Sequence, residues 1–517
     1  MVQKKFEDFA LRLRENDNVA VIKRPFKADT ELVNGAVRLT VAKPVPPGHK
    51  IALATIADGE PVRKYGQIIG FAKGLIAPGE HVHTHNLEMK DFGRDYQFCV
   101  DARPVNYYPA DQMRSFQGYL RPGGRVGTRN YLAVISSVNC SASVSHYVAD
   151  RFKGPEFQKD FPGVDGVIAF THKSGCAIQP GEPHRLLQRV LAGLARHPNI
   201  SGYVMIGLGC EVNQVQFIRN DFNLGRLLPG EATPTFMTIQ SQGGVRRTVE
   251  AGVAAVVKLL PVANGLRRAP QPVSKLVLAE NCGGSDGHSG ITANPALGVA
   301  SDELVRYGGT SVLAETPEIY GAEHLLTRRA VNREVGEKLV ERIHWWENHV
   351  RQHNATIDNN PSFGNREGGL TTIYEKSLGA VAKGGQSPLA AVYQYAEEIS
   401  TPGFCFMDTP GYDPVSMTGL VTGGCNIGVF TTGRGSVYGC KPAPCIKVAT
   451  HTALFEHMNE DMDLNAGTIL DGTETVEQVG RRIFEKIVAV ASGEKTRSEL
   501  AGIGDEEFAP WILGPTF

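Results

Sequence analysis

The chain has 517 residues, with 53 Lys and Arg against 54 Asp and Glu, so its formal net charge is −1 with the histidines neutral. This balance argues against a nucleic-acid partner, because neutralising phosphates needs an excess of Lys and Arg. Hydrophobic residues make up 42% and charged residues 21%, as in a packed globular protein, and a chain of this length divides into several domains.

Cysteine usage and hydropathy bear on the compartment. The nine cysteines are an odd number spread over a long chain, whereas disulfide-stapled secreted domains are short and dense in cysteine. Residues 1–16 alternate charged with apolar residues and lack the apolar core of a signal peptide. No uninterrupted run of about 18 apolar residues occurs. These features predict a reduced, cytoplasmic protein with no membrane partner.

The first 100 residues predict a small β module. Ile56–Val62 and Ile76–Val82 repeat one pattern, in which a Gly turn precedes a short stretch that ends in Val. Short strands separated by turns, including Tyr65–Ala72 between the two copies, are typical of a barrel-like or clip-like β fold. The proline-bearing sequence that follows predicts a linker at 101–117, which would let the module fold without the rest of the chain.

From residue 118 the pattern becomes α/β. Seven buried strands are predicted, at Tyr131–Ser136, Val167–Phe170, Tyr203–Ile206, Lys275–Ala279, Thr310–Ala314, Gly403–Met407 and Gly428–Thr431. Helical patterns such as Pro183–Leu194 and His324–Val350 separate most of them, which favours a mostly parallel sheet covered on both faces. Prolines interrupt the periodicity near 260–274, so we expect a middle domain at 118–265 and a C-terminal domain at 270–517.

Loops rich in Gly, Cys, Ser and charged residues follow several of these strands. Open parallel sheets bind ligands outside the carboxyl ends of their strands, and an arginine such as Arg434 can hold a carboxylate through two hydrogen bonds. The loop Cys282–Asp286 is dense in glycine and polar groups, which favours function. A single Gly-Cys pair after a strand is more typical of a tight turn. We interpret four other cysteines as core or surface residues, namely Cys140, Cys405, Cys440 and Cys445. No CxxC spacing indicates a zinc ribbon or a ferredoxin-like cluster.

The β module contains a second candidate site at His81, His83 and His85. If this segment is a strand, alternation places the three imidazoles on one face. Three imidazoles so aligned can ligate a divalent transition metal. The alternative is an exposed strand with incidental histidines.

Taken together, the motifs resemble the altronate/galactarate dehydratase family. They are Gly48–Lys50, Tyr65–Gly66, His81–Asn86, Gly124–Asn130, Gly207–Glu211, Cys282–Asp286, Thr292–Pro295 and Phe430–Gly435. The resemblance extends from about residue 17 to the C-terminus. It implies an N-terminal SAF (β-clip) domain and an α/β body with a Rossmann-like C-terminal domain. It also implies elimination of water from a sugar acid, with iron(II) or another divalent metal as the activating ion.

The implied reaction converts an aldonate or aldarate into a 2-keto-3-deoxy acid and water. The histidine motif resembles the altronate pattern, which favours altronate as the substrate. The alternatives are a galactarate or other sugar-acid dehydratase, a sulfolactate-type lyase, and a non-catalytic protein that binds a sugar acid. The fused single chain argues against the sulfo-lyase. We expect a homodimer, the commonest oligomer.

This reaction removes a proton α to a carboxylate and expels a hydroxyl group, so it needs a base matched to the working pH and groups that stabilise negative charge. His83, His85 and Cys282 are the predicted metal ligands. His172 and Asp286 are the predicted groups for proton transfer. The predicted substrate-binding residues are Arg121, Asn130, Ser285, Thr432 and Arg434. A metal site built only from strand-end loops of the C-terminal domain is the alternative.

Overall fold

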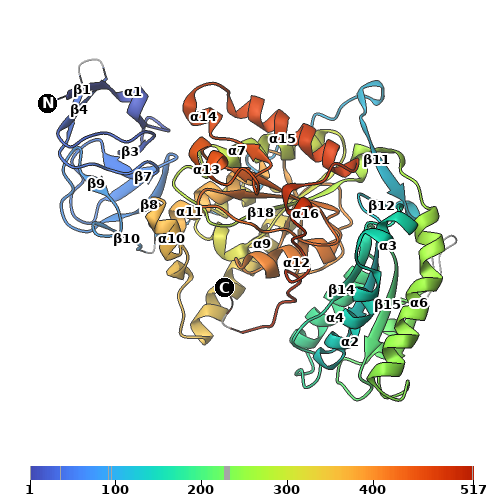
Figure 1. Cartoon of the computed structure of the whole chain (residues 1–517). Coiled ribbons are helices and arrows are strands. Elements are labelled where there is room, and N and C mark those ends of the chain that lie inside the picture. The colour runs from blue at the N-terminus through green and yellow to red at the C-terminus, as the bar shows by residue number, and fades with distance from the viewer. Residues whose placement is uncertain are drawn as a thin grey trace.

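Figure 1 shows the computed structural model, which describes residues 2–34, 37–90, 92–94, 96–225, 233–514 and 516. The N-terminal strands, in blue, lie on one side of a central α/β domain. The middle domain, in green, lies on the other side. The expected α/β class is confirmed, because the two largest sheets, of four and seven strands, alternate with helices along the chain and contain only parallel pairs.

The described part of the N-terminal domain contains three small sheets, with the strand orders β1-β4-β5, β2-β3-β6-β9 and β10-β8-β7. Their elements are β1 (Val2–Lys5), α1 (Phe6–Phe9), β2 (Ala10–Leu11), β3 (Val19–Ile22), β4 (Thr30–Asn34), β5 (Val37–Val41), β6 (Lys50–Ala52), β7 (Pro61–Lys64), β8 (Gln67–Ala72), β9 (His81–Val82) and β10 (Leu87–Glu88). The two copies of the repeated sequence pair with each other, because Ile56 and Ile76 exchange backbone hydrogen bonds of 3.0 and 2.9 Å. Gly59 and Gly79 turn the two copies with positive φ, a conformation that favours glycine.

The N-terminal domain shares an apolar core with the C-terminal domain. Val62, Ile69 and Ile76 belong to the same buried cluster as Ile373 and Tyr374. A module folded without the body would therefore leave this surface uncovered.

The segment expected to be a linker is attached to the C-terminal domain. Asp101 N donates to Arg328 O at 2.7 Å, and Tyr108 N donates to Arg306 O at 3.0 Å. The prolines of this segment indicate irregular backbone, which is why it was expected to be a linker. Irregular backbone can still be bound tightly to a neighbouring domain, as it is here.

The middle domain is inserted between two paired strands. The chain enters through β11 (Ser115–Leu120) and β12 (Val126–Gly127) and leaves through β17 (Ala269–Pro272), which pairs antiparallel with β11. Its parallel sheet has the order β14-β13-β15-β16. The strands are β13 (Tyr131–Ser136), β14 (Gly166–Phe170), β15 (Ile200–Gly207) and β16 (Thr235–Thr238), and the helices are α2 (Ala142–Ala149), α3 (Pro155–Asp160), α4 (Glu182–Ala195), α5 (Val215–Asp221) and α6 (Val245–Gly265).

Alternate residues of β13 cover the two faces of this sheet. Leu132 and Val134 pack with α2 and α6, whereas Ala133 and Ile135 pack with α4 and α5. By length and composition, α6 is the one helix of the described residues apolar enough to cross a membrane, and 39% of its most apolar window is buried. It continues through Pro261, so the domain boundary expected near 260–274 falls after this helix.

The C-terminal domain contains a seven-stranded parallel sheet with the order β20-β21-β19-β18-β22-β23-β24. The strands are β18 (Val277–Cys282), β19 (Thr310–Leu313), β20 (Leu389–Tyr393), β21 (Gly403–Met407), β22 (Ile427–Thr432), β23 (Cys445–Ala449) and β24 (Leu464–Asn465). The helices are α7 (Ala293–Arg306), α8 (His324–Thr327), α9 (Arg333–Gln352), α10 (Phe363–Glu367), α11 (Ile373–Ala380), α12 (Asp413–Gly423), α13 (Thr452–His457), α14 (Thr468–Asp471), α15 (Val476–Ala491) and α16 (Arg497–Leu500). Helices α7 and α15 pack on one face and α12 on the other. The long helix expected at His324–Val350 is two helices, because Asn332 caps the start of α9.

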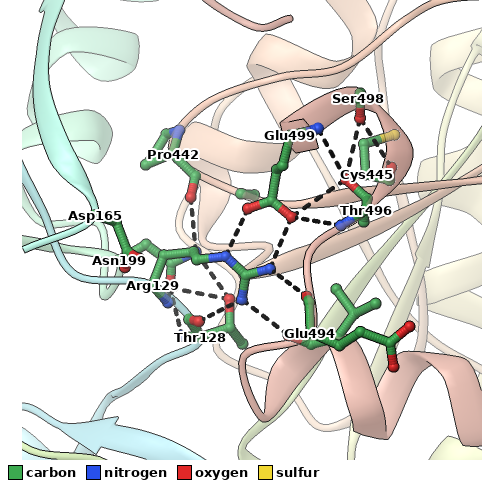
Figure 2. A network of polar contacts seen from close by, with 12 residues as sticks. Thr128, Arg129, Asp165, Asn199, Pro442, Cys445, Glu494, Thr496, Ser498 and Glu499 are labelled. Carbon is green, nitrogen blue, oxygen red and sulfur yellow. Dashed lines mark hydrogen bonds and ion pairs between the residues drawn. The ribbon is translucent and has the colours of Figure 1, made fainter. Parts of the chain in front are cut away.

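A buried arginine joins the middle domain to the C-terminal domain (Figure 2). Arg129 donates hydrogen bonds of 2.6 and 2.8 Å to the two carboxylate oxygens of Glu499. Nearby, Asn199 Oδ1 accepts from Thr128 N at 2.7 Å, and Asn199 Nδ2 donates to Pro442 O at 3.0 Å. Burial opposes ionisation of Glu499, but the hydrogen bonds and charge of Arg129 lower its pKa overall. This two-pronged pair fixes how the two domains meet.

Candidate active site

Three side chains that can ligate a metal meet at the carboxyl edge of the seven-stranded sheet. Strand β18 ends at Cys282, and Glu315 and Glu318 follow the neighbouring strand β19. The Cys282 thiol lies 3.5 Å from Glu315 Oε2 and 3.4 Å from Glu318 Oε2. Among the residues that the structure describes, no other three His, Cys, Asp or Glu side chains bring their ligand atoms within 4.8 Å of one another. Ligands of parallel sheets bind at this edge.

Two buried lysines contact these three groups. Lys383 Nζ donates to Cys282 Sγ at 2.9 Å and to Glu315 Oε2 at 3.1 Å. Lys376 Nζ donates to Glu318 Oε1 at 2.6 Å. Buried charges are tolerated only when they are paired and hydrogen-bonded, and these contacts meet that condition.

A third carboxyl group, that of Asp413, gives this cluster more carboxyl groups than ammonium groups. A Cβ atom at Gly283 would lie 2.3 Å from Asp413 Oδ2, so the loop approaches Asp413 as only glycine can. Burial and then the charge of Glu318 raise the pKa of Asp413 to about 7, and the same two causes raise the pKa of Glu315. The two lysines lower the pKa of Glu318 against the effect of burial. Three carboxyl groups thus face two ammonium groups, and a proton or a cation must neutralise the excess.

The cluster fits a divalent metal ion such as iron(II). In the described part of the chain, Glu315 Oε1 is buried without a hydrogen-bond partner. Carboxylates and thiolates are both iron ligands. Burial and then the charge of Glu315 raise the pKa of Cys282 far above its usual value, so the thiol is protonated until a metal displaces the proton. A cation bound here would occupy the free carboxylate oxygen and balance the extra acid.

Backbone strain marks the same place. Glu315 has φ of 69°, which for a residue with a side chain costs about 1–2 kcal/mol. Its N–H donates to Thr409 Oγ1 at 2.9 Å, which holds the strained conformation. Such strain persists where the surroundings impose it, often at functional sites.

The carboxylate of Asp286 lies in the same loop as Cys282. Its Oδ1 accepts hydrogen bonds from His288 N at 3.1 Å and Ser289 Oγ at 3.0 Å. Asp286 Oδ2 lies 3.6 Å from His288 Nδ1 and 3.8 Å from His451 Nε2. Burial opposes ionisation, but the hydrogen bond and charge of His288 lower the pKa of Asp286 overall. An ionised carboxylate beside two imidazoles is an arrangement that can move protons.

Of the predicted substrate-binding residues, Ser285 lies in this loop, and Thr432 and Arg434 lie beside it. Ser285 Oγ is buried and has no partner among the described residues. Thr432 Oγ1 would lie 3.1 Å from a Cβ at Gly284, and Arg434 N donates to Gly284 O at 2.7 Å. The guanidinium of Arg434 is half exposed and lies 3.2 Å from Glu367 Oε2. An unsatisfied hydroxyl and an accessible guanidinium can bind the hydroxyl and carboxylate groups of a sugar acid.

The histidines of the N-terminal domain lie together, although β9 ends at Val82. A turn follows, in which Asn86 Oδ1 accepts from His83 N at 2.9 Å. The rings of His81 and His83 are 5.3 Å apart, and those of His81 and His85 are 5.5 Å apart. His49 joins them, with its Nδ1 3.0 Å from His81 Nε2. Burial is the largest cause that lowers the pKa of His83 to about 4, so its ring is neutral at pH 7.

The N-terminal domain closely contacts Gly287 and His288, which directly follow the Cys282–Asp286 loop. A Cβ at Gly287 would lie 1.9 Å from Gly48 O, and His288 Nε2 lies 3.2 Å from Ile22 O. A histidine on this domain also reaches the body, because His83 Nε2 lies 2.9 Å from Arg366 O.

A buried ion-pair triad fastens the same interface. Glu375 accepts hydrogen bonds from Lys50 Nζ at 2.8 Å and from Lys64 Nζ at 2.9 Å, and all three side chains are at most 1% exposed. Burial lowers the pKa of Lys50 to about 8. Together with the glycine contact, this triad keeps the N-terminal domain closed over the strand-end loops.

Several predicted site residues are not brought together. His83 and His85 do not join Cys282, because Cys282 faces Glu315 and the lysines inside the C-terminal domain. His172 lies in the middle domain, where its Nε2 is 3.1 Å from Ser136 O and its Nδ1 accepts from Ser174 N. Burial lowers its pKa to about 4.

Arg121 and Asn130 also lie in the middle domain, where they support the backbone. Arg121 donates to Pro198 O at 2.8 Å and to Asn130 Oδ1 at 2.9 Å. Asn130 Nδ2 donates to Gly163 O at 2.6 Å. Both side chains are buried among these partners, away from the loop that contains Asp286.

Four residues of the site were not among those predicted from the sequence, namely Glu315, Glu318, Lys383 and His288. Glu315 directly follows the predicted strand Thr310–Ala314, so the rule that selected Cys282 would have selected it as well. His288 lies two residues beyond Asp286. Lys383 follows helix α11 and has no local signal, because only packing brings it to the sheet edge.

Three family profiles match the chain. The altronate/galactarate dehydratase SAF domain matches residues 8–90, and the D-galactarate dehydratase/altronate hydrolase second domain matches 118–264. The D-galactarate/altronate dehydratase C-terminal domain matches 273–516.

Whole-length relatives agree with these profiles. An altronate dehydratase of Bacillus subtilis (strain 168) is 35% identical over 499 residues, which cover 95% of this chain and 96% of the relative. An altronate dehydratase of Escherichia coli (strain K12) is 37% identical over 490 residues, covering 95% and 96%. Galactarate dehydratase (L-threo-forming) of the same strain is 37% identical over 493 residues, covering 94% and 93%. The chain therefore belongs to the altronate/galactarate dehydratase family and is a sugar-acid dehydratase, a hydro-lyase.

Proposed function

We propose that this dehydratase acts on altronate, at the interface between the strand-end loops of the C-terminal domain and the histidines of the N-terminal domain. The observation that carries the proposal is the buried cluster of Cys282, Glu315, Glu318 and two lysines beside an accessible Arg434. The histidine motif and the names of two of the relatives favour altronate over other sugar acids.

Iron(II) is the metal we propose, with Cys282, Glu315 and Glu318 as the residues that hold it. This set replaces the predicted set of His83, His85 and Cys282. When bound, the ion supplies Lewis-acid stabilisation for negative charge on the substrate. Another divalent metal with the same preference for oxygen and sulfur would serve the same site.

The protein's own residues perform the remaining steps. Arg434 and Ser285 bind the substrate carboxylate and hydroxyls. Asp286 orients His288, and this pair takes the proton from the carbon α to the carboxylate and delivers a proton to the hydroxyl that leaves as water. Lys383 lowers the energy of the negative charge that develops in between, since its ammonium group is fully buried and acts at low dielectric. The enol so formed tautomerises to the 2-keto-3-deoxy acid.

The proposal also includes the fold of each domain, the cellular location and the oligomeric state. We propose that the N-terminal sheets are a β-clip and that the C-terminal domain is Rossmann-like, as its strands and covering helices alternate along the chain. All nine cysteines are free thiols, which supports a reducing cytoplasmic location. A homodimer is proposed because two-fold assemblies are the commonest.

The test is a screen of five- and six-carbon sugar acids with the full chain and ferrous iron under reducing conditions. We expect altronate to give the highest kcat/KM, measured as formation of 2-keto-3-deoxy acid. A chelator should abolish turnover, and added iron should restore it. A higher kcat/KM for galactarate would make galactarate, and not altronate, the substrate. Turnover that survives complete metal removal would contradict the proposed metal dependence.

A further inference from the structure

Three exposed cysteines gather at the carboxyl edge of the other parallel sheet. Strands β14, β13 and β15 are neighbours in the four-stranded sheet, and Cys176, Cys140 and Cys210 lie in the loops that follow them. All three are exposed, whereas the five cysteines of the C-terminal domain are buried. Cysteine is among the most buried residue types, so three exposed cysteines at one sheet edge call for a functional reason.

Backbone hydrogen bonds lock the three loops to one another. Asn139 N, in the loop after β13, donates to Ser174 O at 2.9 Å in the loop after β14. Val212 N, in the loop after β15, donates to Cys176 O at 3.0 Å. The cysteines are therefore presented by one rigid surface, which is what a site with several ligands requires.

Glycines shape this surface. Gly175 and Gly209 precede two of the cysteines with φ of 99° and 129°. A Cβ at Gly175 would lie 2.6 Å from Ser137 O, and one at Gly209 would lie 2.6 Å from Gln240 Oε1. Gln240 Nε2 donates to Cys210 Sγ at 3.4 Å, the kind of N–H···S contact that tunes metal-bound sulfur.

Glu211 and His172 lie in the same loops as the thiols, and both are already engaged by other partners. Glu211 accepts from Ser137 Oγ at 2.9 Å and from Gly209 N at 2.6 Å. His172 uses one ring nitrogen on Ser136 O and the other on a backbone N–H. The thiols are thus the donors that this surface presents.

The spacing of the thiols distinguishes a cluster from a single ion. Four ligands of one tetrahedral zinc, at about 2.3 Å from the metal, place their sulfurs about 3.8 Å apart. The three sulfurs are not all within 4.8 Å of one another, because that condition selects only the Cys282 group among the described residues. The loops of Cys140 and Cys176 are nonetheless neighbours, because Asn139 N donates to Ser174 O at 2.9 Å. A cluster of several iron atoms is wider than one ion and suits thiolates that stand farther apart.

We propose that Cys140, Cys176 and Cys210 hold an iron–sulfur cluster through three thiolates, with one corner open to a small oxygen ligand. The absence of CxxC spacing does not oppose this, because the three ligands come from three strands and meet only in the fold. The site is separate from the Cys282 cluster, which lies on the other sheet.

The test uses the full chain, purified without oxygen and reconstituted with ferrous iron and sulfide. We expect acid-labile sulfide and visible absorption that dithionite bleaches. Cys140→Ser, Cys176→Ser and Cys210→Ser should each lower bound sulfide at least about tenfold. Because these positions are exposed, circular dichroism and thermal unfolding of the metal-free variants should match those of the metal-free parent.

Two controls separate this proposal from the proposed function. Cys405→Ser removes a buried thiol elsewhere and should keep the sulfide and the absorption. Cys282→Ser should also keep both, even if it no longer turns over substrate. Any of three results would overturn the proposal. The reconstituted parent could contain no sulfide, or the cysteines could bind zinc in place of iron. Cys140 and Cys176 could also form a disulfide without metal under the same anaerobic conditions.

Discussion

The carboxyl edges of the two parallel sheets differ in how far their functional side chains are buried. At the edge of the seven-stranded sheet, Cys282, Glu315 and Lys383 are fully buried, and the N-terminal domain packs over the neighbouring loop. At the edge of the four-stranded sheet, Cys140 and Cys176 face solvent. Burial makes each charge interaction stronger and demands that every charge be paired. A covered carboxyl edge can therefore hold strengthened, paired charges, whereas an open edge leaves its thiols accessible to solvent.

Coverage of the first edge depends on Glu375, and its removal should have the largest effect. Glu375→Gln leaves Lys50 and Lys64 buried without a counter-charge, so we expect a loss of about 3–5 kcal/mol in the free energy of unfolding. Denaturant unfolding at pH 7 measures this. The matched control is Glu88→Gln, which removes an exposed pair with Lys90 and should change stability by about 0–1 kcal/mol.

The pH dependence of this difference checks its origin. The two lysines hold the pKa of Glu375 far below its ordinary value of 4.5, although burial opposes them. A lowered pKa in the folded state contributes stability above the unfolded value and loses it as pH falls. The gap between the parent and Glu375→Gln should therefore narrow below pH 4.5. A gap that stays constant down to acid unfolding would contradict the ion-pair explanation.

The next largest effect is expected at the acidic cluster itself. Glu318→Gln removes the carboxylate that two lysines keep ionised, and turnover should fall at least about 100-fold with loss of bound iron. Steady-state kinetics and metal analysis measure the two quantities. Glu337→Gln, on the exposed side of α9, is the control and should leave both unchanged. Iron content that is unchanged in Glu318→Gln would mean that the iron is bound elsewhere.

Substitution of His83 and His85 tests whether the N-terminal domain, which covers the site, takes part in the chemistry. His83→Ala and His85→Ala should each lower turnover by about 10- to 100-fold if these rings orient groups at the site. Iron content should stay unchanged, because the proposed ligands lie on the C-terminal domain. Iron lost together with turnover would restore the histidines as ligands.

A smaller loss is expected for the thiol. Cys282→Ser should leave folding intact and reduce turnover at least about tenfold, which equals about 1.4 kcal/mol of transition-state stabilisation. Kinetics of the purified variant at saturating iron measure this. Wild-type turnover with full metal content would remove Cys282 from the site and weaken the contrast between the two edges.

The smallest effect is expected at the mouth of the site. Arg434→Lys keeps the charge but loses the planar two-pronged geometry, so KM should rise severalfold, by about 3- to 10-fold, with a smaller change in kcat. The side chain is 45% exposed, so thermal stability should change little. Lost stability with unchanged KM would make the role of Arg434 structural.

Local patterns in the sequence were sufficient for much of the fold. Val167–Phe170 and Gly403–Met407 are strands because short apolar runs bounded by turns can be buried on both faces of a sheet. The weaker strands β16, β20, β23 and β24 were missed. Three of them, β16, β20 and β24, are only partly buried, so their apolar pattern is less continuous, whereas β23 is fully buried.

The sequence by itself determined which polar, glycine-rich loops lie at strand ends, because such a loop after an apolar run follows a strand in any parallel sheet. Cys282, Ser285, Asp286 and Arg434 were found in this way. Only the tertiary structure decided their partners. Lys383 reaches Cys282 from 101 residues away, and Glu375 reaches Lys50 from 325 residues away. Pairings over such separations follow from how helices pack on the sheet, and no local pattern encodes them.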